Sequence, residues 1–305
     1  DGIPEDRACP PPAGRGRDRV GRQGTLSGDR SADGERVMKL VRIPLELTGL
    51  GKTFITPDGP VVAVENVNAE IHEGEFVCIL GHSGCGKSTV LSIIAGLQRA
   101  TLGGVVIDGT EVTDPGADRA VVFQAPSLLP WLTARANVEL AMAGAGTRTT
   151  RRWRRERAAH CLVLVGVGDI ADQLPHELSL GTQQCVSMAR ALSTQPRFLL
   201  LDEPFSTLDS LTRFELQDTL LQVWDQLQPR IVVMVTHDID EALYLADRLI
   251  LMTDGPGARV GEILSLPFRR PRERASVLEH PEYLTYRHRV MDFLEHHAHQ
   301  SKSAA

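Results

Sequence analysis

Residues 81–89 read G-H-S-G-C-G-K-S-T and directly follow the apolar run 76–80. Glycines in such a loop adopt backbone angles closed to other residues, so that successive N–H groups turn inward and bind an anion. The N-terminus of a following helix strengthens this phosphate site. Lys87 brings a positive charge near the β- and γ-phosphates, and the Ser88 hydroxyl can bind Mg²⁺. The pattern predicts a nucleoside triphosphate site made by Gly81, His82, Ser83, Gly84, Cys85, Gly86, Lys87, Ser88 and Thr89.

Two acidic residues follow a second apolar strand. Residues 198–201 are all apolar, which suits a strand buried on both faces, and Asp202 and Glu203 come next. Open α/β sheets place their ligands at the carboxyl ends of strands, so these acids are expected beside the phosphate loop. Asp202 would hold Mg²⁺ directly or through water, and Glu203 would polarise an attacking water. Together with the phosphate loop, the pair predicts hydrolysis of the bound nucleotide.

The composition sets the class of protein. The chain has 305 residues, of which 42% are hydrophobic and 24% are charged, enough for one large or two small domains with a sizeable core. A net charge of −6 argues against bulk attraction to nucleic acid or anionic lipid. No apolar run approaches the roughly 18 residues of a membrane span, and no signal-peptide pattern is present. We therefore expect a soluble cytosolic protein.

The cysteines do not form a recognisable framework. Cys9, Cys78, Cys85, Cys161 and Cys185 are odd in number, scattered and without a C-x-x-C pair, which argues against disulfides and a zinc site. Cys78 is expected in the core. Cys85 has two interpretations: a small filler residue of the loop, or a thiol whose modification blocks nucleotide binding.

The chain divides into three expected segments. Residues 1–37 are rich in Gly, Pro and balanced charges with few large apolar residues, so we expect a disordered N-terminal extension, with Met38 as the natural start. Residues 38–275 are expected to form the nucleotide-hydrolysing domain, with a helical part at about 130–190. Residues 276–305 are expected to form a C-terminal helix, starting at 283 and reaching 297, and a tail.

Turn and periodicity signals predict the secondary structure within the domain. Residues 43–125 are strand-rich, with turns at 57–60, 72–74 and 108–109 and one helix at 88–97. Residues 130–195 favour helices, and the basic stretch 148–157 around Trp153 is typical of a solvated helix face rather than a nucleic-acid site. Strands and helices alternate over 197–252, as in a parallel α/β sheet. A short β pair is expected around 255–266.

Residues 178–184 read L-S-L-G-T-Q-Q, and with this motif the chain resembles an ATP-binding subunit of an ABC transporter, whose signature reads L-S-G-G-Q. The resemblance covers about residues 43–300. It identifies Gln124 as the Q-loop glutamine, residues 205–209 as the D-loop, His237 as the switch histidine and Phe54 as the aromatic that stacks on adenine. For three of these residues a purely structural interpretation stays open: Gln124 could simply end a strand, and His237 and Phe54 could be ordinary core residues.

The resemblance implies a fold and a composite site. The fold is α/β, a P-loop NTPase core with a RecA-like parallel sheet, an antiparallel β subdomain and an α-helical signature subdomain. Two copies would sandwich two ATP molecules head to tail. The implied catalytic residues are Glu203, His237 and Gln124; the Mg²⁺ ligands are Ser88, Gln124 and Asp202; and Ser179, Gly181, Gln183 and Asp209 contact ATP across the dimer. The cofactors are ATP and Mg²⁺.

Three residues depart from the family pattern. Leu180 replaces the first signature glycine, Thr182 stands where glutamine is usual, and Cys185 stands where an arginine commonly follows Gln184. Loss of that cation and its donors bears on the rate of hydrolysis more than on the fold. Since the hydrolytic residues are complete, we predict an active ATPase.

Several stretches look similar to the importer group for nitrate, sulfonate and taurine, with nitrate-type subunits most similar: residues 81–85, 204–205, 211–213, 254–263 and 266–272. The implied partners are two transmembrane permease subunits, a periplasmic or lipoprotein solute-binding protein, and a second ATPase, identical or paralogous, at the cytoplasmic face of the membrane. No nucleic acid is implied. Since the chain ends at 305, we expect no fused solute-binding or regulatory domain.

Alternatives remain at the level of the class and of single residues. Trp131 and Leu132 have two possible roles: they line a groove of the helical region that receives a permease subunit, or they pack in the core. The rival classes are a soluble ABC ATPase of translation or DNA repair, an exporter subunit, the ATPase of another importer group, and a binding module without catalysis.

Overall fold

The computed structural model describes residues 44–144, 149–227 and 231–302, and the side chains of all of these except 225–227 and 298–302. Residues 43–305 belong to one compact unit, to which everything below refers. The expected N-terminal extension, the start at Met38 and the thiol of Cys9 lie outside the described residues.

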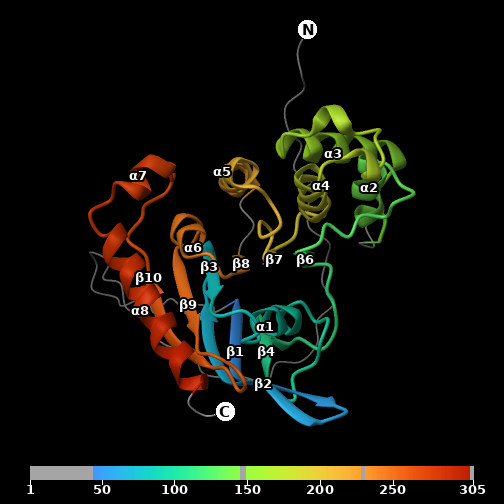
Figure 1. Cartoon of the computed structure of the whole chain (residues 1–305). Helices are drawn as coiled ribbons and strands as arrows, with labels where there is room; N and C mark the ends of the chain where they lie inside the picture. The colour runs from blue at the N-terminus through green and yellow to red at the C-terminus, as the bar shows by residue number, and fades with distance from the viewer. Residues whose placement is uncertain (1–43, 145–148, 228–230, 303–305) are drawn as a thin grey trace, which may run out of the picture. The chain divides into compact units, whose positions relative to one another are not determined.

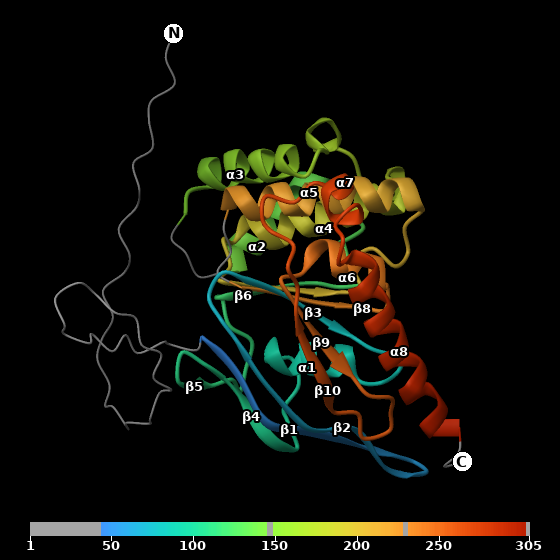
Figure 2. The ribbon, with the colours of Figure 1, turned by 90° about the vertical axis from the view of Figure 1, so that its left-hand side faces the viewer.

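A four-stranded antiparallel sheet forms the first layer (Figure 2). Its order is β2 (Gly59–Ile71), β1 (Leu45–Thr56), β4 (Leu102–Ile107) and β5 (Thr110–Glu111). The predicted turns at 57–60 and 108–109 join the neighbouring strands of two hairpins within it. This sheet is the antiparallel β subdomain that the sequence indicated.

The second sheet has six strands and is mostly parallel. Its order is β10 (Val260–Ser265), β9 (Arg248–Met252), β3 (Glu75–Leu80), β8 (Ile231–Thr236), β7 (Phe198–Asp202) and β6 (Arg119–Val122). All neighbours pair in parallel except β10, which runs antiparallel to β9. The parallel arrangement brings the carboxyl ends of β3, β8, β7 and β6 to one edge, where the predicted site residues follow.

The central strands are buried on both faces because each face meets a different set of elements. In β3, Val77 and Ile79 face a cluster that includes helix α1 (Lys87–Ile94) and the antiparallel sheet. Phe76, Cys78 and Leu80 face a second cluster, which contains the remaining helices. Figures 1 and 2 show α1 between the two sheets.

Three helices form the expected helical subdomain: α2 (Ala134–Gly144), α3 (Arg151–Leu164) and α4 (Leu180–Ser193), with the short 3-10 helices η1 (Gly168–Ile170) and η2 (Pro175–Glu177) between α3 and α4. They lie together in both ribbon views. The predicted basic helix face is confirmed, since Arg151, Arg152 and Arg155 on α3 are exposed.

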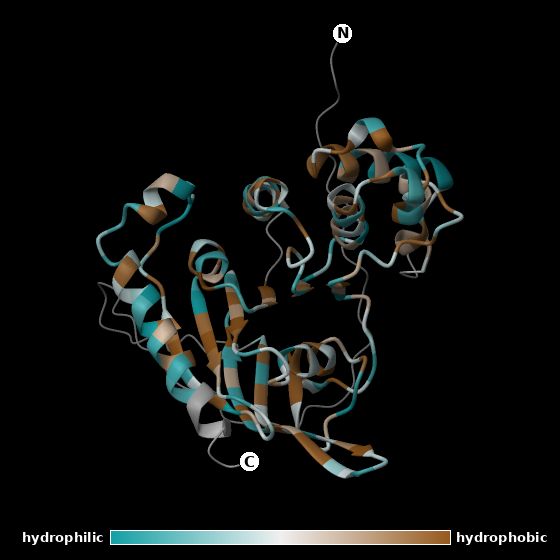
Figure 3. Ribbon diagram, in the orientation of Figure 1, coloured by the Kyte–Doolittle hydropathy of each residue, from teal (hydrophilic) through white to brown (hydrophobic). Residues whose placement is uncertain are grey.

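The last four helices are α5 (Ser210–Leu227), α6 (Ile239–Leu245), α7 (Arg274–Leu278) and α8 (Tyr283–Lys302). Hydrophobic and hydrophilic residues alternate along α8 (Figure 3). This pattern is typical of an amphipathic helix that covers a core with one face. Among the described residues, no helix combines the length and the apolar character that crossing a membrane requires.

Two predicted elements are wrong in their bounds. The β pair expected around 255–266 is a single strand, β10, whose partner is β9, because 255–257 bend away before the pairing starts. The C-terminal helix does not end at 297 but continues to Lys302.

Candidate active site

The phosphate loop joins β3 to α1, as predicted. Gly86 directly precedes the helix and has a φ of 97°, in the left-handed region that favours glycine. A Cβ atom at this position would lie 2.5 Å from Cγ1 of Val64 and 3.2 Å from the carbonyl oxygen of Ala63. Backbone angle and close packing therefore both require glycine here.

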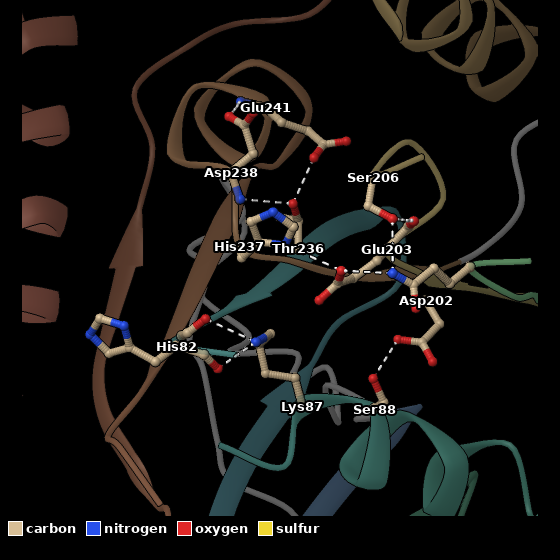
Figure 4. Close-up of polar contacts among 12 residues, drawn as sticks. His82, Lys87, Ser88, Asp202, Glu203, Ser206, Thr236, His237, Asp238 and Glu241 are labelled. Carbon is tan, nitrogen blue, oxygen red and sulfur yellow. Dashed lines mark hydrogen bonds and ion pairs between the residues drawn. The ribbon is translucent and has the colours of Figure 1, made fainter. Parts of the chain in front are cut away.

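Lys87 is almost fully buried, with 4% of its surface exposed. Its Nζ donates to the carbonyl oxygens of Gly81 at 2.9 Å and His82 at 2.7 Å (Figure 4). The loop's own carbonyls thus hold the ammonium group at the centre of the loop. A phosphate group that enters the loop would meet a cation that is already in position.

Ser88 and Asp202 come together from α1 and β7, although they are distant in sequence. The Ser88 hydroxyl donates to Oδ1 of Asp202 at 2.7 Å. Burial raises the pKa of the Asp202 carboxyl, and the hydrogen bond from Ser88 opposes that rise. A hydroxyl and a carboxylate side by side are oxygen donors of the kind that Mg²⁺ prefers, usually completed by substrate phosphates and water.

Glu203 lies at the centre of a cluster that follows β6, β7 and β8. Its Oε2 is 3.2 Å from Nδ1 of His237 and accepts from Nε2 of Gln124 at 3.4 Å. Its backbone has a φ of 44°, a strained value outside glycine, and its N–H donates to the carbonyl of Val235 on β8. Strain at a residue that carries a cluster of polar side chains is typical of functional sites.

Ser206 completes this cluster and was missed as a site residue. Its hydroxyl donates to the carbonyl oxygen of Glu203 at 3.0 Å and accepts from Nε2 of Gln124 at 3.1 Å. The signal available in the sequence was a short polar residue one turn after Glu203. His237 has 56% of its side chain exposed, so the interpretation as a core histidine is wrong.

The signature motif opens a helix, as predicted. Ser179 caps α4: its Oγ accepts from the N–H of Thr182 at 3.1 Å and lies 2.8 Å from the Thr182 hydroxyl. A Cβ atom on Gly181 would lie 2.6 Å from Cγ2 of Thr212, so the start of α4 packs closely on the first turn of α5. Leu180 is 45% exposed at the same helix start.

Two other residues predicted to act across a dimer are held within their own chain. Asp209 precedes α5 and accepts from the N–H groups of Leu211 and Thr212, both at 3.1 Å, and from the Thr212 hydroxyl at 2.7 Å. These hydrogen bonds, the hydroxyl first, lower the pKa of its carboxyl. Gln183 donates its amide to the carbonyls of Pro175 and Leu178.

Phe54 lies on β1 and is half-buried, outside both buried clusters of the described core. The Nζ atom of Lys52 lies 5.1 Å from the centre of its ring. The neighbouring Ile55 is 85% exposed. Phe54 is therefore not a core residue in this structure. Its stacking on adenine remains a prediction.

The structure bears on two further alternatives. Cys85 is fully buried, and burial raises the pKa of its thiol, which favours the filler interpretation over a readily modified thiol. Cys78 is buried, as expected, and the pKa of Cys185 rises to about 12.

Trp131 is 71% exposed and Leu132 is half-buried, so core packing does not explain Trp131.

Comparison with known proteins identifies the family. The family model described as "ABC transporter" matches residues 64–206. The nitrate import ATP-binding protein NrtD of Synechococcus elongatus is 51% identical over 245 residues, which is 80% of this chain and 89% of that protein. The bicarbonate transport ATP-binding protein CmpD of a Synechocystis species is 48% identical over 250 residues, 82% of this chain and 88% of that protein.

A solved structure supports the same assignment. It is a dimeric structure of a post-hydrolysis state of the ATP-binding cassette MJ0796, bound to ADP and Pi. It shares 36% identity with this chain at a TM-score of 0.66, and the match covers 73% of this chain and 98% of that one. The fold is thus the ABC cassette, with its parallel P-loop core, antiparallel subdomain and helical subdomain. Identity of this extent, over nearly the whole of the related proteins, shows that the chain belongs to the ABC transporter family as an ATP-hydrolysing subunit.

Proposed function

We propose that this chain powers the import of a small inorganic anion, nitrate first, through a separate membrane permease. The observation that carries the proposal is its 51% identity to a nitrate import ATP-binding protein over 89% of that protein's length. Bicarbonate is the second candidate, because a bicarbonate transport ATP-binding protein is 48% identical over a similar range. Neither of these two relatives is named for sulfonate or taurine, which the sequence also suggested.

The site residues have distinct roles in this proposal. Ser88 and Asp202 would hold Mg²⁺ together with Gln124, and the ion would neutralise charge on the β- and γ-phosphate oxygens. Glu203 would accept a proton from the attacking water, and His237 would contact both the γ-phosphate and Glu203. The 3.2 Å separation between His237 and Glu203 supports this assignment. Phe54 would stack on the adenine ring.

The complete site requires two chains. Helices α1 and α4 pack in opposite clusters of the core, so the phosphate loop and the signature of one chain belong to different faces of the sheet. In a head-to-tail dimer, Ser179, Gly181, Gln183 and Asp209 of one chain would complete the site around Lys87 of the other. The partner would be a second copy or a paralogous ATPase, and the solved MJ0796 structure, which is dimeric and bound to ADP and Pi, supports a dimer.

The membrane partners follow from the importer assignment. The exposed Trp131, with Leu132 beside it, would contact a permease subunit on the helical subdomain. The dimer would then lie peripherally on the cytoplasmic face of the membrane, beneath two permease subunits that receive the anion from an external solute-binding protein. Residues 38–275 would form the ATPase domain and 276–305 the C-terminal helix and tail.

Purification of the chain from membranes, followed by reconstitution of the resulting complex with its solute-binding protein, tests the proposal. We expect ATP-dependent uptake of labelled nitrate into vesicles, with bicarbonate and taurine assayed in parallel. Glu203→Gln should abolish uptake in the same complex. Uptake of bicarbonate alone would favour the second candidate. Recovery of the chain with cytosolic partners only would contradict the import function.

A further inference from the structure

A cavity of about 310 Å³ lies behind the predicted switch histidine, where α5, α6, α7 and α8 meet. The residues of its lining that matter below are Ser210, Phe214, Asp238, Glu241, Arg274 and Leu278. Its volume is at the lower end of the range of small-molecule sites, about 300–1,000 Å³. A ligand here would therefore be small.

The charges around this cavity are paired except for one. Each of three arginines has its own aspartate: Arg213 with Asp238 at 3.1 Å, Arg274 with Asp218 at 2.7 Å and Arg287 with Asp240 at 2.8 Å. Glu241 forms no ion pair in the part of the chain that the structure describes, although the positive charge of Arg213 lowers the pKa of its carboxyl. The carboxyl groups at the cavity therefore outnumber the arginines that pair with them by one, and a cation is the ligand that would balance the remaining negative charge.

Glu241 is also the most deeply buried acid of the lining, with 7% of its surface exposed. Its Oε2 accepts from the Thr236 hydroxyl at 2.6 Å (Figure 4). Its Oε1 is buried and makes no hydrogen bond within the usual geometric limits among the described residues, although the neighbouring Gln217 side chain is close enough to lower the pKa of the carboxyl. Burial raises the pKa of this carboxyl to about 7. A buried carboxylate oxygen without a well-formed hydrogen bond has a strong preference for a donor.

The walls of the cavity suit an organic cation rather than a metal ion. The guanidinium of Arg274 lies 4.1 Å from the ring centre of Tyr244 and 4.4 Å from that of Phe214, so the aromatic rings already bind one cation through their faces. Phe214 and Leu278 present half-exposed apolar surface at the same place. Among the described residues, no cluster of three His, Cys, Asp or Glu side chains could hold a metal.

We propose that this cavity binds a small primary amine whose ammonium group pairs with Glu241 and whose apolar body packs between Phe214 and Leu278. The amine lies against two segments of the ATP site, since Ser210 directly follows Asp209 and Asp238 directly follows His237. Occupancy therefore changes ATP turnover. The cavity is an effector site, separate from the phosphate loop.

The test uses benzylammonium chloride as the probe and benzyl alcohol, its neutral counterpart, as the control ligand. Calorimetric titration into the full-length protein should show binding of the amine at least tenfold tighter than of the alcohol. Glu241→Gln should weaken amine binding at least tenfold, whereas Glu215→Gln, an exposed acid on α5 outside the cavity, should leave it unchanged. Leu278→Trp fills the cavity without changing its charge and should also abolish binding.

ATP turnover of the wild-type protein should change at saturating amine and not with benzyl alcohol or with sodium chloride of equal ionic strength. Equal affinity for amine and alcohol, or amine binding that survives both Glu241→Gln and Leu278→Trp, would overturn the site. Binding with unaltered turnover would overturn its role as an effector site. If Glu241→Gln fails to fold, Leu278→Trp still decides the result, because that side chain is half-exposed.

Discussion

The Nδ1 atom of His237, which follows β8, lies 3.2 Å from Oε2 of Glu203, which follows β7. The two strands are neighbours in the sheet, so the contact depends on their register, in which Asp202 pairs with Val235. Glu203 thus has a partner that can orient its carboxylate toward a water molecule. The contact connects the predicted general base with the residue predicted to contact the γ-phosphate.

Replacement of Glu203 by glutamine should separate ATP binding from hydrolysis. Glutamine keeps the shape of the side chain but cannot accept the proton, and a positioned base contributes about 10²–10⁴-fold to rate. We expect phosphate release to fall at least a hundredfold while ATP binding is retained and the dimer accumulates. Phosphate assays and size-exclusion chromatography with ATP would measure this, with Glu215→Gln as the control. Full turnover in Glu203→Gln would show that another group is the base.

Replacement of Ser206 by alanine should reduce turnover without loss of fold. The hydroxyl bridges the carbonyl of Glu203 and the amide of Gln124, and one such hydrogen bond is worth about 1 kcal/mol, or roughly fivefold in rate. We expect a lower kcat with an unchanged KM for ATP. Thr219→Ala removes a hydroxyl that bonds only within α5 and serves as the matched control. An effect on KM alone would assign Ser206 to ATP binding.

The contact between Gly181 and Thr212 can be tested by a compensating pair. Gly181→Ala places a methyl group 2.6 Å from Cγ2 of Thr212, and overpacking of this kind costs about 1–3 kcal/mol. Thr212→Ser removes Cγ2 but keeps the hydroxyl that binds Asp209. The double variant should therefore regain most of the lost stability in urea unfolding. Additive losses in the two variants would mean that the residues do not touch.

The buried carboxyl of Glu241 should make stability depend on pH. Its folded pKa of about 7 lies above its ordinary value of 4.5, so between these values the folded state binds more protons than the unfolded state. Its contribution to stability is thus fully present below pH 4.5 and is lost as the pH rises through 7. Burial dominates this shift and Asp238 adds to it, whereas the Thr236 hydroxyl, Arg213 and Gln217 oppose it.

Comparison with Glu241→Gln isolates this effect. The glutamine variant cannot ionise, so its stability relative to the wild type should increase from pH 5 to pH 8, by an amount on the order of 2–3 kcal/mol. Chemical denaturation at several pH values gives the difference, with Glu215→Gln as a control. A difference that does not change with pH would show that Glu241 keeps an ordinary pKa.

Local patterns in the sequence predicted the parts of the fold that depend on neighbouring residues. The apolar runs of β3, β7 and β8, the hairpin turns and the phosphate loop all carry their signals within a few positions. The convergence of Asp202, Glu203 and His237 was also predictable, because parallel strands end at the same edge of a sheet.

What could not be predicted depends on contacts between distant segments. The burial of Cys85 arises because Gly81 and the strand that ends at Met252 close over the loop. The role of Ser206 depends on the proximity of β6, which positions Gln124, and β7. The cavity around Glu241 exists only because α7 and α8 pack beside α5 and α6, an arrangement without a local signal.

The packing of Gly181 on Thr212 has a consequence for the timing of hydrolysis. In the proposed dimer, the start of α4 serves the ATP bound by the partner, whereas α5 follows the segment that carries the same chain's own Glu203. Since the two helices meet with no room for a methyl group, a displacement of one is passed to the other. Hydrolysis of the two ATP molecules would then be correlated, because cleavage at one site would change the rate of cleavage at the other.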